Sequence, residues 1–547
     1  MNYRGAAGAL PAGVRARFRR GHAERRGAGQ ALAAEDLQVD PVGDTPYRAL
    51  ARSPGEARRK ARGCAHTLEQ SLLDWAAAVA VRQMICFAQW TSRRDNNRMK
   101  WLRVSALAAL AFCLASPSLH ALDKQPAGAY RARRVALAGK MRGGVAVLFA
   151  AEEPLLDFMP YRQDSDFYYL TGWTEPGAAL LIVADAPNAA APRTYKEILF
   201  LPARNLLMEK YTGAKMDAAT KGVAEAAGVD AVEPMTDLPG DLTRLIAADR
   251  SLIVNVWAQP DSSAATALLS FTGVTLGNDT APKARDVTSL TMPLRQIKDE
   301  GEIELLKKAS TASILAQRVM MQWWVKPGMT ERAVAGGMTA VWMENGCERP
   351  SYAPIVGSGI NSTTLHYAAN DRTMQDGDIL LVDAACEYSM YAADITRTVP
   401  VNGHFTPRQR EIYNIVLGAQ RAAIDAFVAG KSTINDRDRQ DPNSLDAVAY
   451  NYINTHGKDL HGQPLGQYWL HGLGHMIGID VHDPGNYPAV LKPGMVFSIE
   501  PGVYIPEEKI GVRIECDFLV GQDGKLIDLD AALAHTPEEI EAAMRAK

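Results

Sequence analysis

Two pairs of carboxylates constrain the fold of this chain more than any other feature. Asp383 directly follows the apolar run 379–382, and Asp394 lies in a second run of strand character. A two-residue turn at 388–389 would place Asp383 opposite Asp394 on one face of a β-hairpin, although this turn lacks glycine and asparagine, so a bulged variant is an alternative. Two like charges so close repel each other unless a cation or a proton lies between them. For this pair taken alone, two solvated strand-end aspartates are the favoured interpretation, and a cation site is the alternative.

The same spacing recurs downstream. Glu500 and Glu515 have their midpoint between Glu507 and Glu508, so a hairpin that turns there places Glu500 opposite Glu515. Pro501 cannot donate a backbone hydrogen bond, and the strand is therefore irregular or at an edge at that point. Two surface glutamates are again the favoured interpretation of this pair taken alone.

Histidines cluster between the two predicted hairpins. His471, His475 and His482 fall within twelve residues that are otherwise mostly glycine or apolar, and His366 follows a glycine-containing segment that begins at Gly357. A single histidine is more often packed or on the surface than a ligand, whereas three in one short segment favour a functional site.

Strand and helix patterns alternate between residues 128 and 290, which is typical of an α/β layer domain. We expect helices over 129–140 and 215–227, and strands over 145–150, 166–171, 178–183, 197–201 and 251–256. A domain boundary is expected near 291–295. Beyond it we expect helices from about 300 to the Pro-Gly pair at 327–328, from an N-cap at Thr330 to about Asn345, and over 408–428. Further strands are expected over 379–382, 391–399, 495–499 and 512–520.

The first 121 residues differ in composition from the rest. Residues 1–98 hold 16 Arg and 1 Lys against 9 Asp and Glu. Met99 opens a short basic segment, which runs into the mostly apolar stretch 104–115 and ends in small residues at Ala121. This is the order of a secretory signal peptide. We therefore expect residues 1–98 to be a non-native or disordered upstream extension, residues 99–121 to be a signal peptide, and the protein to be exported to the periplasm or secreted. A buried helix within a genuine N-terminal extension is the alternative.

The body of the chain is acidic. Residues 122–547 hold 40 Lys and Arg against 53 Asp and Glu. We expect no nucleic-acid partner, because phosphate contacts need clustered Lys and Arg, and no stable membrane insertion after signal cleavage. Only Cys347, Cys386 and Cys516 follow the expected cleavage point, and this odd number without a CxxC motif indicates no disulfide framework. The sequence is compatible with a homo-oligomer.

The ordered set of acidic residues and histidine resembles a known metallopeptidase pattern. Asp383, Asp394, His475, Glu500 and Glu515 match, in order, the five metal ligands of the pita-bread family that includes methionine aminopeptidase, prolidase and aminopeptidase P (Xaa-Pro aminopeptidase). The flanking segments are similar to those of aminopeptidase P in particular. These segments are residues 161–172, 349–359, 383–388, 394–398, 468–475 and 499–504, and the resemblance covers about 130–547. The departures are Ala385, Met390 and Ala393, where relatives often have glycine, Cys516, where an acid is common, and the short segments 500–515 and 431–471. They concern loop geometry and the shape of the site entrance rather than ligands.

The resemblance implies an α/β (α+β) fold. It places a C-terminal pita-bread catalytic domain at residues 293–547, preceded by a smaller α/β N-terminal domain with a mixed sheet at residues 122–292. It also implies two divalent metal ions, whose charge would balance four carboxylates. Oxygen-rich ligation suits Mn²⁺, with Co²⁺ or Zn²⁺ as alternatives.

The implied activity is that of a metal-dependent exopeptidase, which releases the N-terminal residue from a peptide substrate with proline in second position by means of a metal-bridging hydroxide. In this interpretation Glu500 also accepts the proton of the attacking water, and His366 and His482 donate to the carbonyl oxygen. His471 would line the proline side of the substrate, with Tyr504 and Arg513 in support. An Xaa-Pro dipeptidase (prolidase) and a non-catalytic pita-bread binding protein are the alternatives.

Overall fold

The structure is a computed structural model. It describes residues 123–153, 161–185, 195–249, 252, 255–260, 262–270, 284–436 and 439–546, which belong to one compact unit. The upstream extension and the signal peptide expected at residues 1–121 lie outside the described residues. None of the described helices has the length and apolar character that a membrane span requires.

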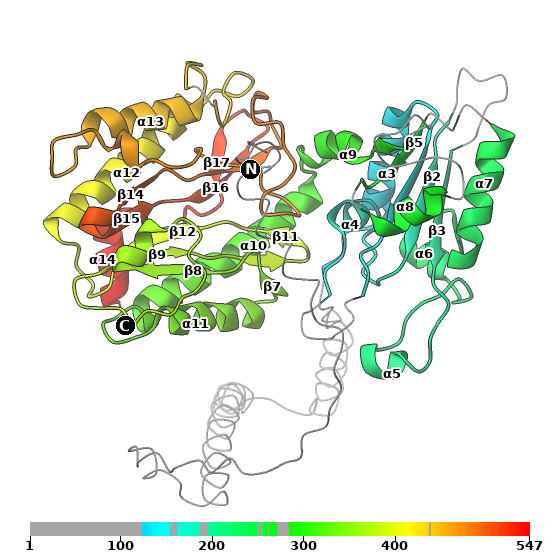
Figure 1. Ribbon diagram of the computed structural model, residues 1–547, viewed down its shortest axis with the longest axis horizontal. Helices are drawn as coiled ribbons and strands as arrows, with labels where there is room; N and C mark the ends of the chain where they lie inside the picture. The colour runs from blue at the N-terminus through cyan, green and yellow to red at the C-terminus, as the bar shows by residue number, and fades with distance from the viewer. Residues whose placement is uncertain are drawn as a thin grey trace, which may run out of the picture. The chain divides into compact units, whose positions relative to one another are not determined.

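A mixed six-stranded sheet forms the centre of the N-terminal domain (Figure 1). Its order is β4-β3-β2-β1-β5-β6, with antiparallel pairing from β1 through β2 to β3 and parallel pairing elsewhere. The strands are β1 (Val145–Phe149), β2 (Ala179–Val183), β3 (Lys196–Leu201), β4 (Ala231–Pro234), β5 (Val256–Ala258) and β6 (Arg285–Asp286). This confirms the mixed sheet that the sequence predicted.

Helices cover both faces of this sheet because alternate strand residues point to opposite sides. Ala146 and Leu148 pack in one apolar cluster with α3 (Ala127–Met141) and α4 (Ser165–Thr171). Val145 and Val147 pack in another with α7 (Leu238–Ala248) and α8 (Ser263–Ser270). The shorter helices are α5 (Glu209–Thr212) and α6 (Val223–Ala227), and α9 (Thr288–Arg295) runs through the expected domain boundary.

One predicted strand of this domain is a helix. Residues 166–171 belong to α4, which begins at an Asp164 cap whose side chain accepts a hydrogen bond from the Phe167 amide at 2.8 Å and ends at Gly172 with a φ of 61°. Six of the seven residues of α4 are buried, and a short apolar run shows no period that separates strand from helix. The helix expected over 215–227 is limited to α6, and the strand expected over 251–256 begins only at Val256.

The C-terminal domain consists of two halves of similar make-up. In the first half, α10 (Glu300–Val319) and α11 (Glu331–Glu344) accompany the sheets β8-β9-β12 and β7-β10-β11. In the second half, α12 (Pro407–Ala426) and α13 (Leu445–His456) accompany β13-β16-β17 and the pair β14-β15, and α14 (Pro537–Arg545) closes the chain. The strands are β7 (Arg349–Pro350), β8 (Ile355–Ser358), β9 (Ile379–Asp383), β10 (Cys386–Tyr388), β11 (Tyr391–Ala392), β12 (Thr396–Pro400), β13 (Val496–Ile499), β14 (Gly502–Ile505), β15 (Ile510–Arg513), β16 (Cys516–Val520) and β17 (Leu526–Asp528).

The helix starts follow the sequence closely. Asp299 and Thr406 each form a capping box at the start of α10 and α12, and Thr330 caps α11 as predicted. The long helix continues past α10 as a π-helical turn, Met320–Trp324, and ends before the predicted Pro-Gly pair.

The predicted strands 391–399 and 512–520 are each split in two. The first breaks between β11 and β12, and the second breaks between β15 and β16. Asp394 and Glu515 lie in these two breaks, Asp383 is the last residue of β9, and Glu500 follows β13. The four carboxylates therefore all lie at strand ends, where side chains are free of the regular ladder.

A disulfide joins Cys347, just beyond α11, to Cys386 in β10. The odd number of cysteines without a CxxC motif indicated no disulfide framework, and this disulfide corrects that expectation. Cys516 is buried and free.

Candidate active site and metal centre

The first predicted hairpin forms with a different register. Its turn is Ser389–Met390, and both residues have positive φ, 50° and 72°. Asp383 therefore pairs with Thr396 rather than with Asp394. The predicted direct opposition was wrong because the turn lies one residue later than the midpoint between the aspartates. Residues two positions apart on a strand share a face, so Asp383 and Asp394 still project to the same side.

The second predicted hairpin has the predicted register. Gly502 pairs with Arg513, and Ile499 pairs with Cys516 on the other side of the break. The same register places Glu500 opposite Glu515. The turn is the short helix Pro506–Glu508 followed by Lys509 with a positive φ. The strand is interrupted at Pro501, as the missing N–H predicted.

The structure brings the two hairpins and one histidine together. Oxygens of Asp383, Asp394 and Glu515 lie within 4.8 Å of one another, and so do donor atoms of His475, Glu500 and Glu515. His475 Nε2 lies 3.3 Å from Asp394 Oδ2 and 3.5 Å from Glu500 Oε1. All five predicted ligand residues therefore converge at one place.

Burial and mutual repulsion make this place unfavourable for four negative charges. Burial, followed by the neighbouring carboxylates, raises the pKa of Asp394, Glu500 and Glu515 well above the usual range. Among the described residues, Arg513 is the one Arg or Lys that pairs with these carboxylates, with its Nη2 2.5 Å from Asp383 Oδ2. A group of oxygen donors with so little compensating charge fits hard divalent cations.

His475 presents an unprotonated nitrogen to this group. Burial lowers its pKa to about 4, so the ring is neutral at neutral pH. Its Nδ1 lies 3.2 Å from the Met476 carbonyl oxygen, which places the proton on Nδ1. The Nε2 lone pair then faces the carboxylates, which is the arrangement of a metal-ligating histidine.

A chain of hydrogen bonds links Arg513 to His471. Arg513 Nη1 donates to the Tyr504 hydroxyl at 2.8 Å, which lies 2.8 Å from His471 Nε2. His471 Nδ1 lies 2.7 Å from the Gly472 carbonyl oxygen and donates to it. Burial and the charge of Arg513 lower the pKa of His471 to about 3, so this ring is also neutral. Arg513 thus orients one ligand carboxylate and, through Tyr504, one imidazole.

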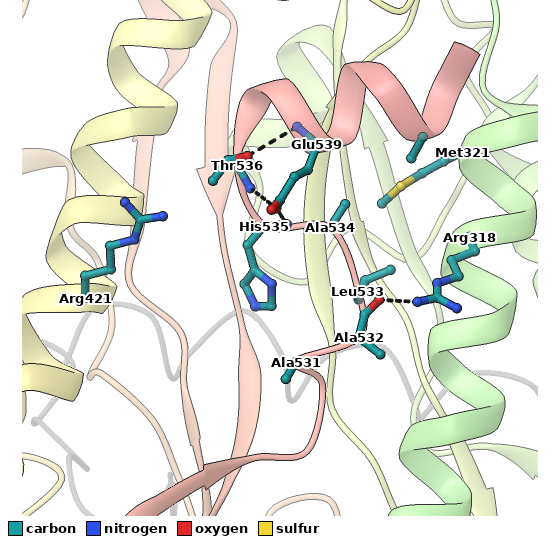
Figure 2. A pocket seen from close by; sticks show the side chains of 11 residues that line it. Arg318, Met321, Arg421, Ala531, Ala532, Leu533, Ala534, His535, Thr536 and Glu539 are labelled. Carbon is teal, nitrogen blue, oxygen red and sulfur yellow. Dashed lines mark hydrogen bonds between the residues drawn. The ribbon is translucent and has the colours of Figure 1, made fainter. Parts of the chain in front are cut away.

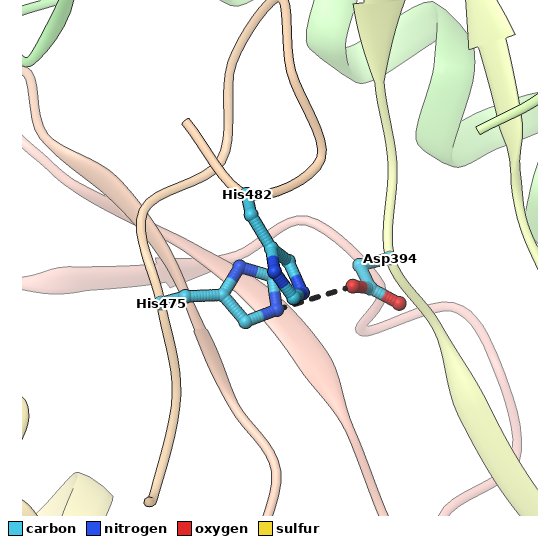
Figure 3. Close-up of side chains that lie close together, drawn as sticks. All are labelled: Asp394, His475 and His482. Carbon is cyan, nitrogen blue, oxygen red and sulfur yellow. Dashed lines mark ion pairs between the residues drawn. The ribbon is translucent and has the colours of Figure 1, made fainter. Parts of the chain in front are cut away.

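The other two predicted histidines lie at the exposed side of the site. The rings of His482 and His475 are 4.0 Å apart between centroids, and both lie next to Asp394 (Figure 3). His366 is exposed and close enough to act electrostatically on His471 and His482. Both His366 and His482 can therefore reach a molecule that enters from solvent.

Sequence reasoning missed Tyr352. Its hydroxyl lies 2.5 Å from Asp383 Oδ1 and 2.6 Å from Asp394 Oδ1, so it bridges the two aspartates. Two further contacts were missed: Thr396 Oγ1 donates to Glu515 Oε2 at 2.6 Å, and Asp517 accepts from the Asp394 amide at 2.9 Å. Tyr352 lies in the segment at 349–359 that resembles the family, which is the signal that could have pointed to it.

We expect Tyr352→Phe to weaken divalent metal binding by about 10–100-fold, because it removes the hydroxyl that orients two carboxylates. Titration of Mn²⁺ into metal-free protein by calorimetry measures the effect. Tyr413→Phe is the matched control, because this buried hydroxyl donates to the His535 carbonyl away from the site. Equal metal affinity in Tyr352→Phe and the wild type would contradict the assignment.

A second cluster of donor atoms lies at the start of β16. Cys516 Sγ is 3.0 Å from His535 Nε2, and Asp528 is close to both. Arg397 Nη2 lies 3.0 Å from the same nitrogen and 3.5 Å from the same sulfur, so a guanidinium already supplies the cation. The cluster borders a cavity of about 410 Å³ into which His535 points (Figure 2). We assign no metal to this cluster.

Two segments of the chain match known families. Residues 304–522 match metallopeptidase family M24, and residues 130–254 match the N-terminal domain of aminopeptidase P. The Xaa-Pro aminopeptidase of Escherichia coli is 35% identical over an alignment of 443 residues, and the match covers 76% of this chain and 97% of that protein. The Xaa-Pro aminopeptidase of Haemophilus influenzae is 35% identical over 403 residues, 70% of this chain and 89% of that protein.

Solved structures show the same architecture. The low-pH form of Escherichia coli aminopeptidase P superposes with a TM-score of 0.67 at 32% identity and covers 78% of this chain and 99% of that one. Proline aminopeptidase P II from Yersinia pestis gives a TM-score of 0.64 at 31% identity, with 77% and 100% coverage. The two αβ halves are thus those of the pita-bread fold, as the sequence predicted.

Proposed function

The chain belongs to the aminopeptidase P group of metallopeptidase family M24, and we therefore propose that it is a metal-dependent Xaa-Pro aminopeptidase. The observation that carries the proposal is the convergence of four carboxylates and one neutral imidazole in a site with a single compensating arginine. Neither alternative from the sequence is favoured: a non-catalytic relative would not need all five donors, and the two relatives described above are aminopeptidases rather than dipeptidases.

We propose that Asp383, Asp394, His475, Glu500 and Glu515 hold two divalent ions. Their donor atoms fall into two overlapping groups, with Glu515 in both, which supports two ions rather than one. Mn²⁺ suits the oxygen-rich set, with Co²⁺ or Zn²⁺ as alternatives. When bound, such ions lower the pKa of water and polarise a carbonyl group.

The protein's own groups move the protons. Glu500 is proposed to accept the proton of the attacking water and to pass it to the nitrogen of the leaving proline. The 17% exposure of its side chain supports this role, because water can reach the carboxylate. His366 and His482 would donate to the carbonyl oxygen as negative charge develops there. The neutral His471, held by Tyr504, is proposed to line the pocket of the proline ring.

Proline in second position sets special demands on such a site. Its amide carries no N–H, and its ring fixes φ near about −65°. A peptidase that binds its substrate through the amide N–H of the second residue does not accept proline there. A pocket with His366 and His471 can accept the proline ring. A free amine beside the carboxylates would then fix the cut one residue from the end.

Comparison of four peptides tests this function: Xaa-Pro, Xaa-Pro-Yaa, N-acetylated Xaa-Pro-Yaa and Xaa-Ala-Yaa, each with Mn²⁺ and product analysis by mass spectrometry. We expect release of Xaa from Xaa-Pro-Yaa, with little cleavage of the alanine and acetylated peptides. Cleavage of the dipeptide alone would identify a prolidase. Equal cleavage of the acetylated peptide would overturn the exopeptidase assignment.

We also propose that the protein is exported and that its domains divide at 292–293. The basic, apolar and small-residue order of residues 99–121 supports export, and the Cys347–Cys386 disulfide is typical of an oxidising compartment. The two family matches lie on opposite sides of the proposed division.

A further inference from the structure

Two buried glutamines hold the strand ends that carry the carboxylates. In the first half, Gln317 of α10 donates from Nε2 to the carbonyl oxygens of Ala384 and Ile395, each at 3.2 Å. These two residues directly follow Asp383 and Asp394 in the chain. One amide group therefore joins the two backbone segments just beyond the two aspartates.

The second half repeats this arrangement. Gln420 of α12 donates from Nε2 to the carbonyl oxygens of Ile499 and Ile514, at 3.1 Å and 3.2 Å. These two residues directly precede Glu500 and Glu515. In each half, one helical glutamine thus bridges the two carbonyl groups adjacent to a carboxylate pair.

The strand interruption at Pro501 explains why a side chain, rather than the backbone, bonds the carbonyl oxygen of Ile514. Pro501 lies opposite Ile514, whose amide bonds the Pro501 carbonyl at 3.4 Å, but proline has no N–H to return to the Ile514 carbonyl. A buried carbonyl oxygen without a hydrogen-bond donor is costly. Gln420 supplies the missing donor, and its second hydrogen bond sets the distance to the neighbouring strand.

Both glutamines are buried, so their hydrogen bonds to the backbone carbonyls lie in the interior of the protein. Gln317 is fully buried and Gln420 is 2% exposed. Among the described residues, Gln317 Oε1 is buried without a hydrogen-bond partner, so this side chain is used through its N–H groups alone. A residue needed only to fill space at such a position would not be an amide.

We infer that Gln317 and Gln420 are a matched pair of positioning residues, each of which fixes the spacing of one carboxylate pair for metal binding. Gln317 acts on Asp383 and Asp394, and Gln420 acts on Glu500 and Glu515. Neither touches substrate or a ligand side chain, so the effect passes through the backbone. The inference rests on the proposed function, since it concerns the same metal centre.

The test compares Gln317→Met and Gln420→Met with Gln409→Met. Methionine keeps the length of the side chain and removes its donors. Gln409 is the matched control, because it is also buried and donates to a backbone carbonyl, that of Gly377 at 2.9 Å, which does not adjoin a carboxylate ligand. The measurements are the Mn²⁺ dissociation constant of the metal-free protein, the melting temperature, and kcat and KM at saturating Mn²⁺.

We expect all three variants to melt at a lower temperature. Only Gln317→Met and Gln420→Met are expected to bind Mn²⁺ about 10–100-fold more weakly, as for other residues that orient ligands, and to lose kcat rather than KM. An Mn²⁺ affinity and kcat within twofold of those of Gln409→Met would overturn the inference. If a methionine variant does not fold, the milder Gln317→Asn and Gln420→Asn variants decide by the same criterion, because the shorter amide cannot reach both carbonyls.

The wild-type protein separates this inference from the proposed function. If the wild type fails to bind Mn²⁺ or to cleave Xaa-Pro-Yaa, the function is wrong. If the wild type does both and the two variants match Gln409→Met, the function stands and the positioning role is wrong.

Discussion

Replacement of Glu500 by glutamine is expected to lower kcat/KM for an Xaa-Pro-Yaa peptide by about 10⁴-fold, the upper end of what general base catalysis contributes. Glu500 has two proposed tasks, metal binding and proton transfer, and an amide performs neither well. Its geometry supports both, since Oε1 lies 3.5 Å from His475 Nε2 while the side chain keeps some exposure to solvent. Steady-state kinetics at saturating Mn²⁺ measure the loss.

Glu507→Gln is the control for this experiment. Glu507 lies exposed in the turn of the same hairpin, so its replacement changes the charge without touching the site. We expect its kinetics to match those of the wild type. A Glu500→Gln enzyme that retains more than about a hundredth of the activity would remove Glu500 from the role of general base.

His475→Ala is expected to lower the metal content below two ions per chain and to reduce kcat/KM by more than about 100-fold. His475 supplies the one nitrogen donor among the five proposed ligands. Removal of a residue that only orients a ligand typically lowers metal affinity or activity by about 10–100-fold. Removal of a ligand itself is expected to lower both further. The fold should persist, because the side chain packs against His482 and carboxylates rather than in an apolar core. Elemental analysis and circular dichroism measure the two properties.

His461→Ala provides the comparison, since this imidazole is exposed on the surface and only the backbone of His461 is held, by Asp459. It should retain full metal content and activity. An active His475→Ala enzyme with unchanged metal content would show that the predicted ligand set is wrong at this position.

Acid should release the metal from this site. In the metal-free protein, burial and mutual repulsion raise the pKa of Asp394, Glu500 and Glu515 well above the usual range. Protons therefore compete with metal ions for these carboxylates from a higher pH than they do for exposed ones. The same three groups explain why a cation is needed for all four carboxylates to be ionised together.

Local sequence predicted those features that depend on neighbouring residues. The side chains of Asp299, Thr330 and Thr406 each accept a hydrogen bond from a backbone amide three residues later. The start of each helix can therefore be predicted from a few neighbouring residues. The pairing of Glu500 with Glu515 also follows from local features, namely the turn at Pro506–Glu508 and the strand interruption at Pro501. The Asp383–Asp394 register failed because Ser389 and Met390 adopt positive φ, which neither residue type favours.

The helix α4 shows a different failure of local reasoning. Its residues are buried almost throughout, so hydrophobic periodicity, which depends on one face being polar, carries no information there. Asp164, a residue type that often caps helices, was the local indication of a helix. The short apolar run that follows it favoured a strand instead.

The amino-acid sequence alone identifies the groups that could form the site: four carboxylates at strand ends, a histidine cluster, and their order along the chain. That these groups meet is visible only in the folded protein. The Glu515 amide bonds the Thr396 carbonyl at 3.1 Å, and Asp517 accepts from the Asp394 amide, so the second hairpin is joined to the first. The physical reason is that these bonds connect segments far apart in the chain, whose contact depends on how α10 and α12 pack behind the strands. No local period or turn rule encodes such a contact, and for the same reason the bridging roles of Tyr352, Gln317 and Gln420 became visible only in the fold.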